Sequence, residues 1–167
     1  LRPDSDVDVL AVLGQVLPQK ARDSLTEGLL TLSGKPGSGK PERSIELIAV
    51  CRSGVLPWRY PPRREYLYGE WLREEMERGQ AQGPADDPDL TLILAQAIRH
   101  SAPLLGPRLE ELLDPVPMRD VRRAMRDCLP GLLKSLRGDE RNVLLTLARM
   151  WYTAAQGDFI PKDAAAA

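Results

Sequence analysis

The sequence is poor in the residues that most often carry metal and nucleophilic chemistry. It contains two cysteines and one histidine in 167 residues. Cys51 and Cys128 lie far apart and fit no metal-ligand spacing, so we expect two reduced, packed thiols, with one disulfide left open by the spacing. His100 cannot form a metal cluster alone, and no Ser-His-Asp arrangement can be built around it. We therefore interpret His100 as a structural or surface residue.

The sequence also lacks an excess of charge of either sign, a long apolar run and a signal peptide. Its 23 basic and 24 acidic side chains nearly balance, which argues against a general nucleic-acid binder. Any anionic ligand must then be held by a local site. No apolar stretch is long enough to span a membrane. We expect a soluble, cytoplasmic protein without nucleic-acid or membrane partners, long enough for one domain or two small ones.

Two acids near the start of the sequence stand at the head of an apolar run. Asp6 and Asp8, which follow Ser5, come just before a predicted buried strand over residues 9–13. Because residues i and i+2 of a strand share a face, the two carboxylates would point into one site. Paired carboxylates can hold Mg²⁺ against the phosphates of a nucleotide. The alternative, two solvated acids flanking a turn, stays open.

A third acid lies inside a second predicted strand. In residues 44–50 polar and apolar side chains first alternate and then give way to apolar ones. Glu46 lies inside this pattern, which is an unusual place for a carboxylate. If Glu46 shared the face of Asp6 and Asp8, two acids could hold a metal while the third accepted a proton from an attacking hydroxyl. The alternation equally allows Glu46 to lie on the solvent side of an edge strand.

One segment has the spacing of a phosphate-binding loop. Residues 34–40 read G-x-x-x-x-G-K, but Pro41 stands where that motif needs serine or threonine. The segment also follows a predicted helix and leads into a strand, which is the reverse of a phosphate loop. We interpret it as a linker.

Short strands followed by helices predict an α+β fold. The hinge Asp114-Pro115-Val116-Pro117 is the best domain boundary, which gives domains over 1–114 and 115–167. Helices are predicted over 20–32, over 90–100, over 118–136 with a break near Pro130, and over 140–156, the last closed by Gly157 and apolar enough to be buried.

Three other residues have ordinary structural interpretations. Asp139 precedes a predicted helix and suits its N-cap. Lys162 suits a solvated position in a first helical turn, and Trp71 suits a core.

Five irregular segments of the sequence stand out: Pro57-Trp58-Arg59-Tyr60-Pro61, Gly69-Glu70-Trp71, Asp114-Pro115-Val116-Pro117, Gly138-Asp139-Glu140-Arg141-Asn142-Val143 and Pro161-Lys162-Asp163. In these segments the sequence closely resembles one family, the bacterial aminoglycoside nucleotidyltransferases that adenylylate streptomycin and spectinomycin (the 3''/9 adenylyltransferases). The resemblance implies a nucleotidyltransferase domain of the DNA polymerase β type, with a small mixed sheet and helices, followed by an all-helical bundle domain. ATP and the antibiotic would bind between them.

The resemblance also implies a role for each acid of the predicted site. Asp6 and Asp8 would be Mg²⁺ ligands. Glu46 would join this metal-binding set, contact the antibiotic, and act as the base that deprotonates its hydroxyl. The implied reaction is in-line transfer of AMP to that hydroxyl with release of pyrophosphate, which gives antibiotic resistance.

The resemblance assigns the remaining candidates to the two substrates. Ser5 would neighbour the nucleotide, and Lys162 would reach the ATP phosphates, for which lysine is a compact charge. Trp71 and Asp139 would contact the antibiotic from the two domains, because an indole offers a flat packing face and an acid suits a polycation. The family also suggests a monomer.

The sequence departs from the family pattern in three places. The family's Gly-Ser motif upstream of the paired acids would fall before Leu1, so a chain beginning there is expected to bind ATP poorly. The last helices would lie beyond Ala167. Residues 134–137 stand where streptomycin-modifying members carry another acid, which makes spectinomycin the better-supported substrate. The alternatives are a related nucleotidyltransferase with another hydroxyl acceptor, and a non-catalytic remnant that binds ligand.

Overall fold

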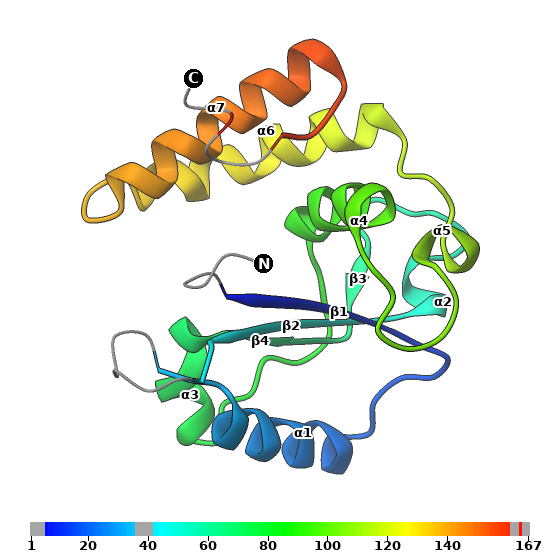
Figure 1. Cartoon of the computed structure of the whole chain (residues 1–167), viewed down its shortest axis with the longest axis vertical. Coiled ribbons are helices and arrows are strands. Elements are labelled where there is room, and N and C mark those ends of the chain that lie inside the picture. Colours follow the sequence, from blue (N-terminus) through cyan, green and yellow to red (C-terminus); the bar gives the residue numbers. More distant parts are fainter. Residues whose placement is uncertain (1–5, 36–41, 161–163, 165–167) are drawn as a thin grey trace. The chain divides into compact units, whose positions relative to one another are not determined.

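The computed structural model describes residues 6–35, 42–160 and 164. Ser5, Lys162 and most of the predicted linker lie outside the described residues. The chain forms two compact units, Leu1–Asp87 and Pro88–Ala167, which are described separately. Their elements are labelled in Figure 1.

The first unit is built on a three-stranded sheet in the order β1-β2-β4. β1 (Val7–Leu13) runs parallel to β2 (Ile45–Cys51), and β2 is antiparallel to β4 (Tyr66–Tyr68). A smaller sheet pairs β3 (Arg63–Arg64) with β5 (Ala85–Asp86). The strands predicted over 9–13 and 44–50 are therefore confirmed.

Helices cover one face of the larger sheet (Figure 1). Leu29 of α1 (Gln19–Leu32) and Met76 of α3 (Arg73–Glu77) pack with the buried strand residues Ala49, Tyr66 and Tyr68. Because these apolar side chains all leave water together, this cluster is the main core of the unit. The unit also contains the short helix α2 (Arg52–Val55) and the 3₁₀ turn η1 (Glu70–Leu72).

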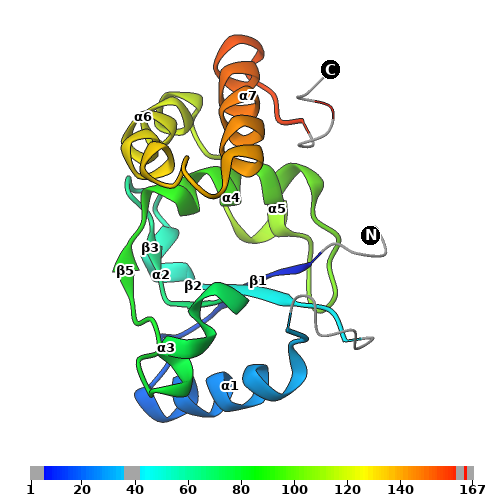
Figure 2. The same ribbon diagram turned by 90° about the vertical axis from the view of Figure 1, so that its left-hand side faces the viewer.

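The described part of the second unit is helical. Its helices α6 and α7 lie side by side, and α6 also packs against α4 (Figure 2). Ala95, Val121 and Met125 form the buried centre of this packing. The predicted end at Gly157 is confirmed, because this glycine adopts φ 75°, a left-handed conformation that glycine reaches at little cost. The helices are α4 (Pro88–His100), α5 (Leu109–Leu112), α6 (Met118–Lys134) and α7 (Glu140–Gln156).

Two helix predictions were wrong in detail. α6 continues through Pro130 instead of breaking there. Pro130 and Arg126 are both exposed, so solvent can hydrate the carbonyl that loses its hydrogen bond. α7 is not buried all round, since Leu144 is 59% exposed and Trp151 is 77% exposed. The helix packs through one stripe, as amphipathic helices do, and its other apolar residues face away from that stripe.

The compact units divide between Asp87 and Pro88. The hinge at Asp114-Pro115-Val116-Pro117 instead connects α5 to α6 within the second unit, because α4 packs against α6. Cys51 is buried and Cys128 is half-buried, and neither belongs to a disulfide within the described residues. None of the helices within the described ranges is long and apolar enough to cross a membrane.

Candidate functional site

Alternation along β1 and β2 places acids on the sheet face opposite α1. The residues of these strands that pack into the core beneath α1 are odd-numbered, so even-numbered residues point to the opposite face. Asp8 and Glu46 are register partners in the parallel ladder and therefore stand side by side on that face. The core-facing residues are Ala11, Leu13, Ile45, Leu47 and Ala49.

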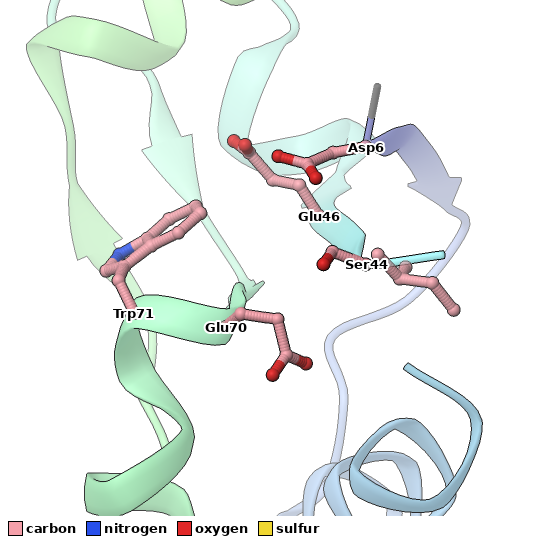
Figure 3. A pocket seen from close by; sticks show the side chains of 6 residues that line it. Asp6, Ser44, Glu46, Glu70 and Trp71 are labelled. Carbon is pink, nitrogen blue, oxygen red and sulfur yellow. The ribbon is translucent and has the colours of Figure 1, made fainter. Parts of the chain in front are cut away.

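A pocket of about 360 Å³ opens where β1 and β2 begin. Figure 3 shows the carboxylates of Asp6 and Glu46 at the same end of the pocket, with the indole of Trp71 standing across the pocket from Ser44. The carboxylate of Glu70 turns away from the other two acids. The lining residues are Asp6, Ser44, Ile45, Glu46, Glu70 and Trp71.

Trp71 is an exposed wall of this pocket and not a core residue. Its side chain is 62% exposed, so the core interpretation of this tryptophan is wrong. η1 carries the indole away from the sheet, and the ring lies against the backbone of Gly69. A Cβ at residue 69 would lie 2.3 Å from the ring. Glycine is therefore needed next to Trp71 because of space, not because of backbone angles.

Glu70 is the acid of the pocket lining that is most enclosed in hydrogen bonds. Burial alone would raise the pKa of its carboxyl, but hydrogen bonds from Arg73, Ser33 and Tyr68 outweigh this and lower the pKa. Burial of Tyr68, and then its hydrogen bond to Glu70, raise the pKa of that phenol to about 12. Glu70 is thus a charged, satisfied acid at neutral pH.

The acids of the pocket have the chemistry that Mg²⁺ requires. Within the described ranges, no group of three histidine, cysteine or acidic side chains is placed to hold a metal ion. Mg²⁺ is nevertheless commonly held by one or two carboxylates together with water and substrate phosphates. Asp6 and Glu46 line one pocket, and Asp8 is the register partner of Glu46, so the donor set fits this ion.

Asp139 belongs to the second unit and stands at the N-cap position of α7, as predicted. Its side chain is exposed and makes no capping hydrogen bond to the backbone of the described residues. It instead accepts a hydrogen bond from the Asn142 amide at 3.0 Å. A second acid lies in the first turn of α7, where the carboxylate of Glu140 accepts a hydrogen bond from the backbone amide of Gly138 at 3.0 Å. The carboxylate of Asp139 therefore remains at the surface.

Sequence reasoning missed three residues of the pocket lining. The sequence pattern around Ser44 and Ile45 indicates a strand and nothing that would place these residues in a pocket. Glu70 had one available signal, its spacing of three residues from Arg73, which allows an ion pair on one helical face. That spacing is common on solvated helices and would not by itself have indicated a pocket.

The chain is similar to known proteins over nearly its whole length. Residues 111–167 match the family described as aminoglycoside adenylyltransferase, C-terminal domain. A spectinomycin 9-adenylyltransferase from Staphylococcus aureus is 53% identical over 166 residues, which cover 99% of this chain and 64% of that protein. An aminoglycoside (3'') (9) adenylyltransferase from Escherichia coli is 40% identical over 168 residues, with the same two coverages. The chain thus spans somewhat less than two thirds of the curated relatives that it matches.

A solved structure gives the same result for the fold. It is the crystal structure of a spectinomycin adenyltransferase from Enterococcus faecialis with ATP and spectinomycin. It is 39% identical, has a TM-score of 0.94, and is matched over 99% of this chain and 67% of its own. The predicted fold, a nucleotidyltransferase domain followed by a helical domain, is confirmed by this likeness. The chain belongs to the family of spectinomycin and aminoglycoside (3'') (9) adenylyltransferases.

Proposed function

We propose that this protein transfers AMP from ATP to a hydroxyl of an aminocyclitol antibiotic and thereby confers resistance to it. The observation that carries the proposal is the pocket lined at one end by the carboxylates of Asp6 and Glu46 and walled by the exposed indole of Trp71. Acids for a metal and a base, next to a flat apolar wall, are what transfer to a cationic, hydroxylated ligand requires.

In the proposed reaction Glu46 is the general base. The antibiotic hydroxyl attacks the α-phosphorus of ATP, the bond from that phosphorus to the bridging oxygen breaks, and pyrophosphate leaves. Glu46 accepts the proton of the hydroxyl as the new phosphorus–oxygen bond forms. Its place on β2, a strand paired on both sides, holds the carboxylate on a rigid element.

Asp6, Asp8 and Glu46 would hold Mg²⁺, which would supply positive charge against the phosphates of ATP. Asp8 and Glu46 are neighbours in a parallel ladder, which fixes the separation of their Cα atoms. Asp6 lines the pocket just before β1 begins, and Asp8 stands on β1 beside Glu46 of β2, so the three acids come from two neighbouring strands and the residue before them.

We assign the antibiotic to Trp71 and Asp139. The indole provides a packing face for the sugar-like rings, and the exposed carboxylate of Asp139 provides charge for an amine or guanidine. Ser5 is assigned to the nucleotide and Lys162 to the ATP phosphates, where a compact ammonium suits a polyphosphate.

Spectinomycin is our first choice of substrate, and streptomycin is the second. The Staphylococcus aureus relative at 53% identity is named for spectinomycin alone, whereas the relative named for both positions is 40% identical. The stretch in which the family resemblance implies another acid for streptomycin-modifying members contains no acid here, but Lys134, Ser135, Leu136 and Arg137. Because the co-substrate is ATP, we propose that the enzyme works in the cytoplasm, and that it does so as a monomer.

The proposal is tested by incubating the protein with ATP, Mg²⁺ and each antibiotic of a panel. Pyrophosphate release gives the rate, and mass spectrometry of the antibiotic identifies an AMP adduct. We expect the adduct on spectinomycin. An adduct only on a different hydroxyl compound would replace the proposed acceptor.

Thermal unfolding with the same ligands separates an enzyme from a binding remnant. A binding remnant would be stabilised by ATP or an antibiotic, because a ligand that binds the native state raises the unfolding temperature, yet would form no adduct. Stabilisation without an adduct on any antibiotic would contradict the proposed activity.

A further inference from the structure

Glu70 lines the pocket, but its carboxylate is turned into the interior (Figure 3). Its side chain is 8% exposed and that of its partner Arg73 is 9% exposed. The pair is bidentate, with Arg73 Nε 2.7 Å from Oε2 and Nη2 2.8 Å from Oε1. A buried ion pair of this kind is weak evidence for net stability, but it fixes geometry strongly.

The pair is tied to the end of α1. Arg73 Nη1 donates to the carbonyl of Leu30 at 2.9 Å, and Nη2 donates to the carbonyl of Ser33 at 2.9 Å. Because carbonyls at the end of a helix lack partners within it, the guanidinium satisfies groups that would otherwise be unpaired. Arg73 thereby fixes the start of α3, and with it η1, to α1.

A second connection runs from Glu70 to β2 through one hydroxyl. Ser33 Oγ donates to Glu70 Oε1 at 2.5 Å and accepts a hydrogen bond from the backbone amide of Ile45 at 2.9 Å. Ile45 is the first residue of β2 and directly precedes Glu46. Two hydrogen bonds through the hydroxyl of Ser33 therefore connect Glu70 to β2, the strand that carries the proposed base.

The opposite wall of the pocket depends on Glu70 through the backbone. Trp71 follows Glu70 in η1, and its indole is too exposed to be fixed by packing on all sides. The ring rests on Gly69, the residue before Glu70. The direction of the indole is therefore set by the backbone of residues 69–71, which the side chain of Glu70 anchors.

We infer that Glu70 is a positioning residue that holds the indole of Trp71 and the strand of Glu46 at a fixed separation across the pocket. The inference rests on the proposed function for its effect on catalysis. Glu70 acts through its neighbours, since its carboxylate is directed to Arg73, Ser33 and Tyr68. Glu70 thereby determines how the antibiotic that accepts AMP is held between Glu46 and the indole of Trp71.

The first test uses fluorescence and needs no activity. In a background of Trp58→Phe and Trp151→Phe, Trp71 is the sole tryptophan of the three. Glu70→Gln is expected to change the acrylamide quenching constant of Trp71 by at least 1.5-fold at a temperature where circular dichroism shows an intact fold. The matched control is Glu74→Gln, an exposed acid of α3, which should leave quenching unchanged. Equal quenching in Glu70→Gln and the parent would overturn the inference.

The second test separates the two substrates. Glu70→Gln is expected to lower kcat/KM for spectinomycin on the order of tenfold or more, because small misplacements of reacting groups are costly. The KM for ATP should stay within twofold. In a Trp71→Ala background the effect of Glu70→Gln on the KM for spectinomycin should shrink, since the indole is then absent. Two results would contradict a positioning role. One is an equal rise in the KM values for ATP and for spectinomycin; the other is an effect of Glu70→Gln on the KM for spectinomycin that stays the same in the Trp71→Ala background.

A third variant covers the case in which Glu70→Gln does not fold. Ser33→Ala keeps the ion pair and removes only the hydroxyl between Glu70 and the Ile45 amide. It should lower kcat several-fold while leaving Trp71 quenching unchanged, and an unaltered kcat would overturn the connection to β2. A wild-type protein that forms no AMP adduct would refute the proposed function, whereas the quenching test would still decide the role of Glu70.

Discussion

Replacing Arg73 with methionine removes the partner of a buried carboxylate while keeping an unbranched, apolar side chain. Glu70 accepts hydrogen bonds from Ser33 and Tyr68 as well as from Arg73. In Arg73→Met it would keep the two hydroxyl donors and lose its only positively charged partner among the described residues. The carbonyls of Leu30 and Ser33 would also lose a donor.

The expected cost is large because the charge stays buried. Breaking a buried pair by removing one partner costs about 3–5 kcal/mol. This is a substantial share of the roughly 5–15 kcal/mol that holds a typical domain folded. We therefore expect the free energy of unfolding of the first unit to fall by about 3–5 kcal/mol in Arg73→Met.

Urea unfolding followed by circular dichroism measures this change. Arg78→Met is the matched control, because Arg78 is exposed at the end of α3 and should change stability by no more than about 0.5 kcal/mol. Adding Glu70→Gln to Arg73→Met should restore part of the loss, since no charge then remains buried. A loss below about 1 kcal/mol in Arg73→Met, or fully additive losses in the double variant, would refute this reasoning.

Three further changes test the same region. Gly69→Ala should raise the KM for spectinomycin on the order of tenfold while preserving the unfolding temperature, because residue 69 has an extended backbone and the three atoms nearest to an added methyl group all belong to the indole. Stability should fall as the pH rises from about 10 to about 12, because native Tyr68 retains its proton there and the unfolded chain does not, and Tyr68→Phe should flatten this slope. Stability should also fall as the pH drops below about 4, because the lowered pKa of Glu70 makes the unfolded state bind more protons, and Glu70→Gln should weaken this loss. An unchanged KM for spectinomycin in Gly69→Ala would contradict the first expectation. A pH dependence of stability that is the same as in wild type would contradict the second in Tyr68→Phe and the third in Glu70→Gln.

Local patterns in the sequence were sufficient to predict those strands and helix ends that depend on a short apolar pattern or on a single terminal residue. The strand around Val9 follows from a continuous apolar run and the strand around Leu47 from apolar alternation, and Gly157 ends α7 because glycine reaches a left-handed conformation cheaply. These features depend on a few neighbouring residues, so no knowledge of the tertiary structure was needed.

Side-chain environments that depend on packing between distant segments could not be predicted. The face of Glu46 became clear only from the residues of β2 that pack beneath α1. Trp71 was expected in a core but is exposed, because η1 directs it away from the sheet. Glu70 is enclosed by Ser33, which follows α1, and by groups from β4 and α3, and no local sequence pattern indicates that these segments meet.

The apolar content of α7 was also misleading. Leu144 and Trp151 are seven residues apart and share a helical face, so they read as a core stripe. In the structure it is Val143 and Thr153 that are buried, while Leu144 and Trp151 are exposed. Periodicity identifies an apolar face, but the packing partner decides which face is covered.

The most direct measurement of the proposed function is the rate of AMP transfer to spectinomycin by Glu46→Gln. The amide keeps the size of the carboxylate but cannot accept the proton of the hydroxyl. We predict a rate at least about 100-fold below wild type with an unchanged unfolding temperature. The control Glu27→Gln, an exposed acid of α1, should transfer AMP at the wild-type rate. Transfer by Glu46→Gln at the wild-type rate would contradict the assignment of the base and of the pocket built around it.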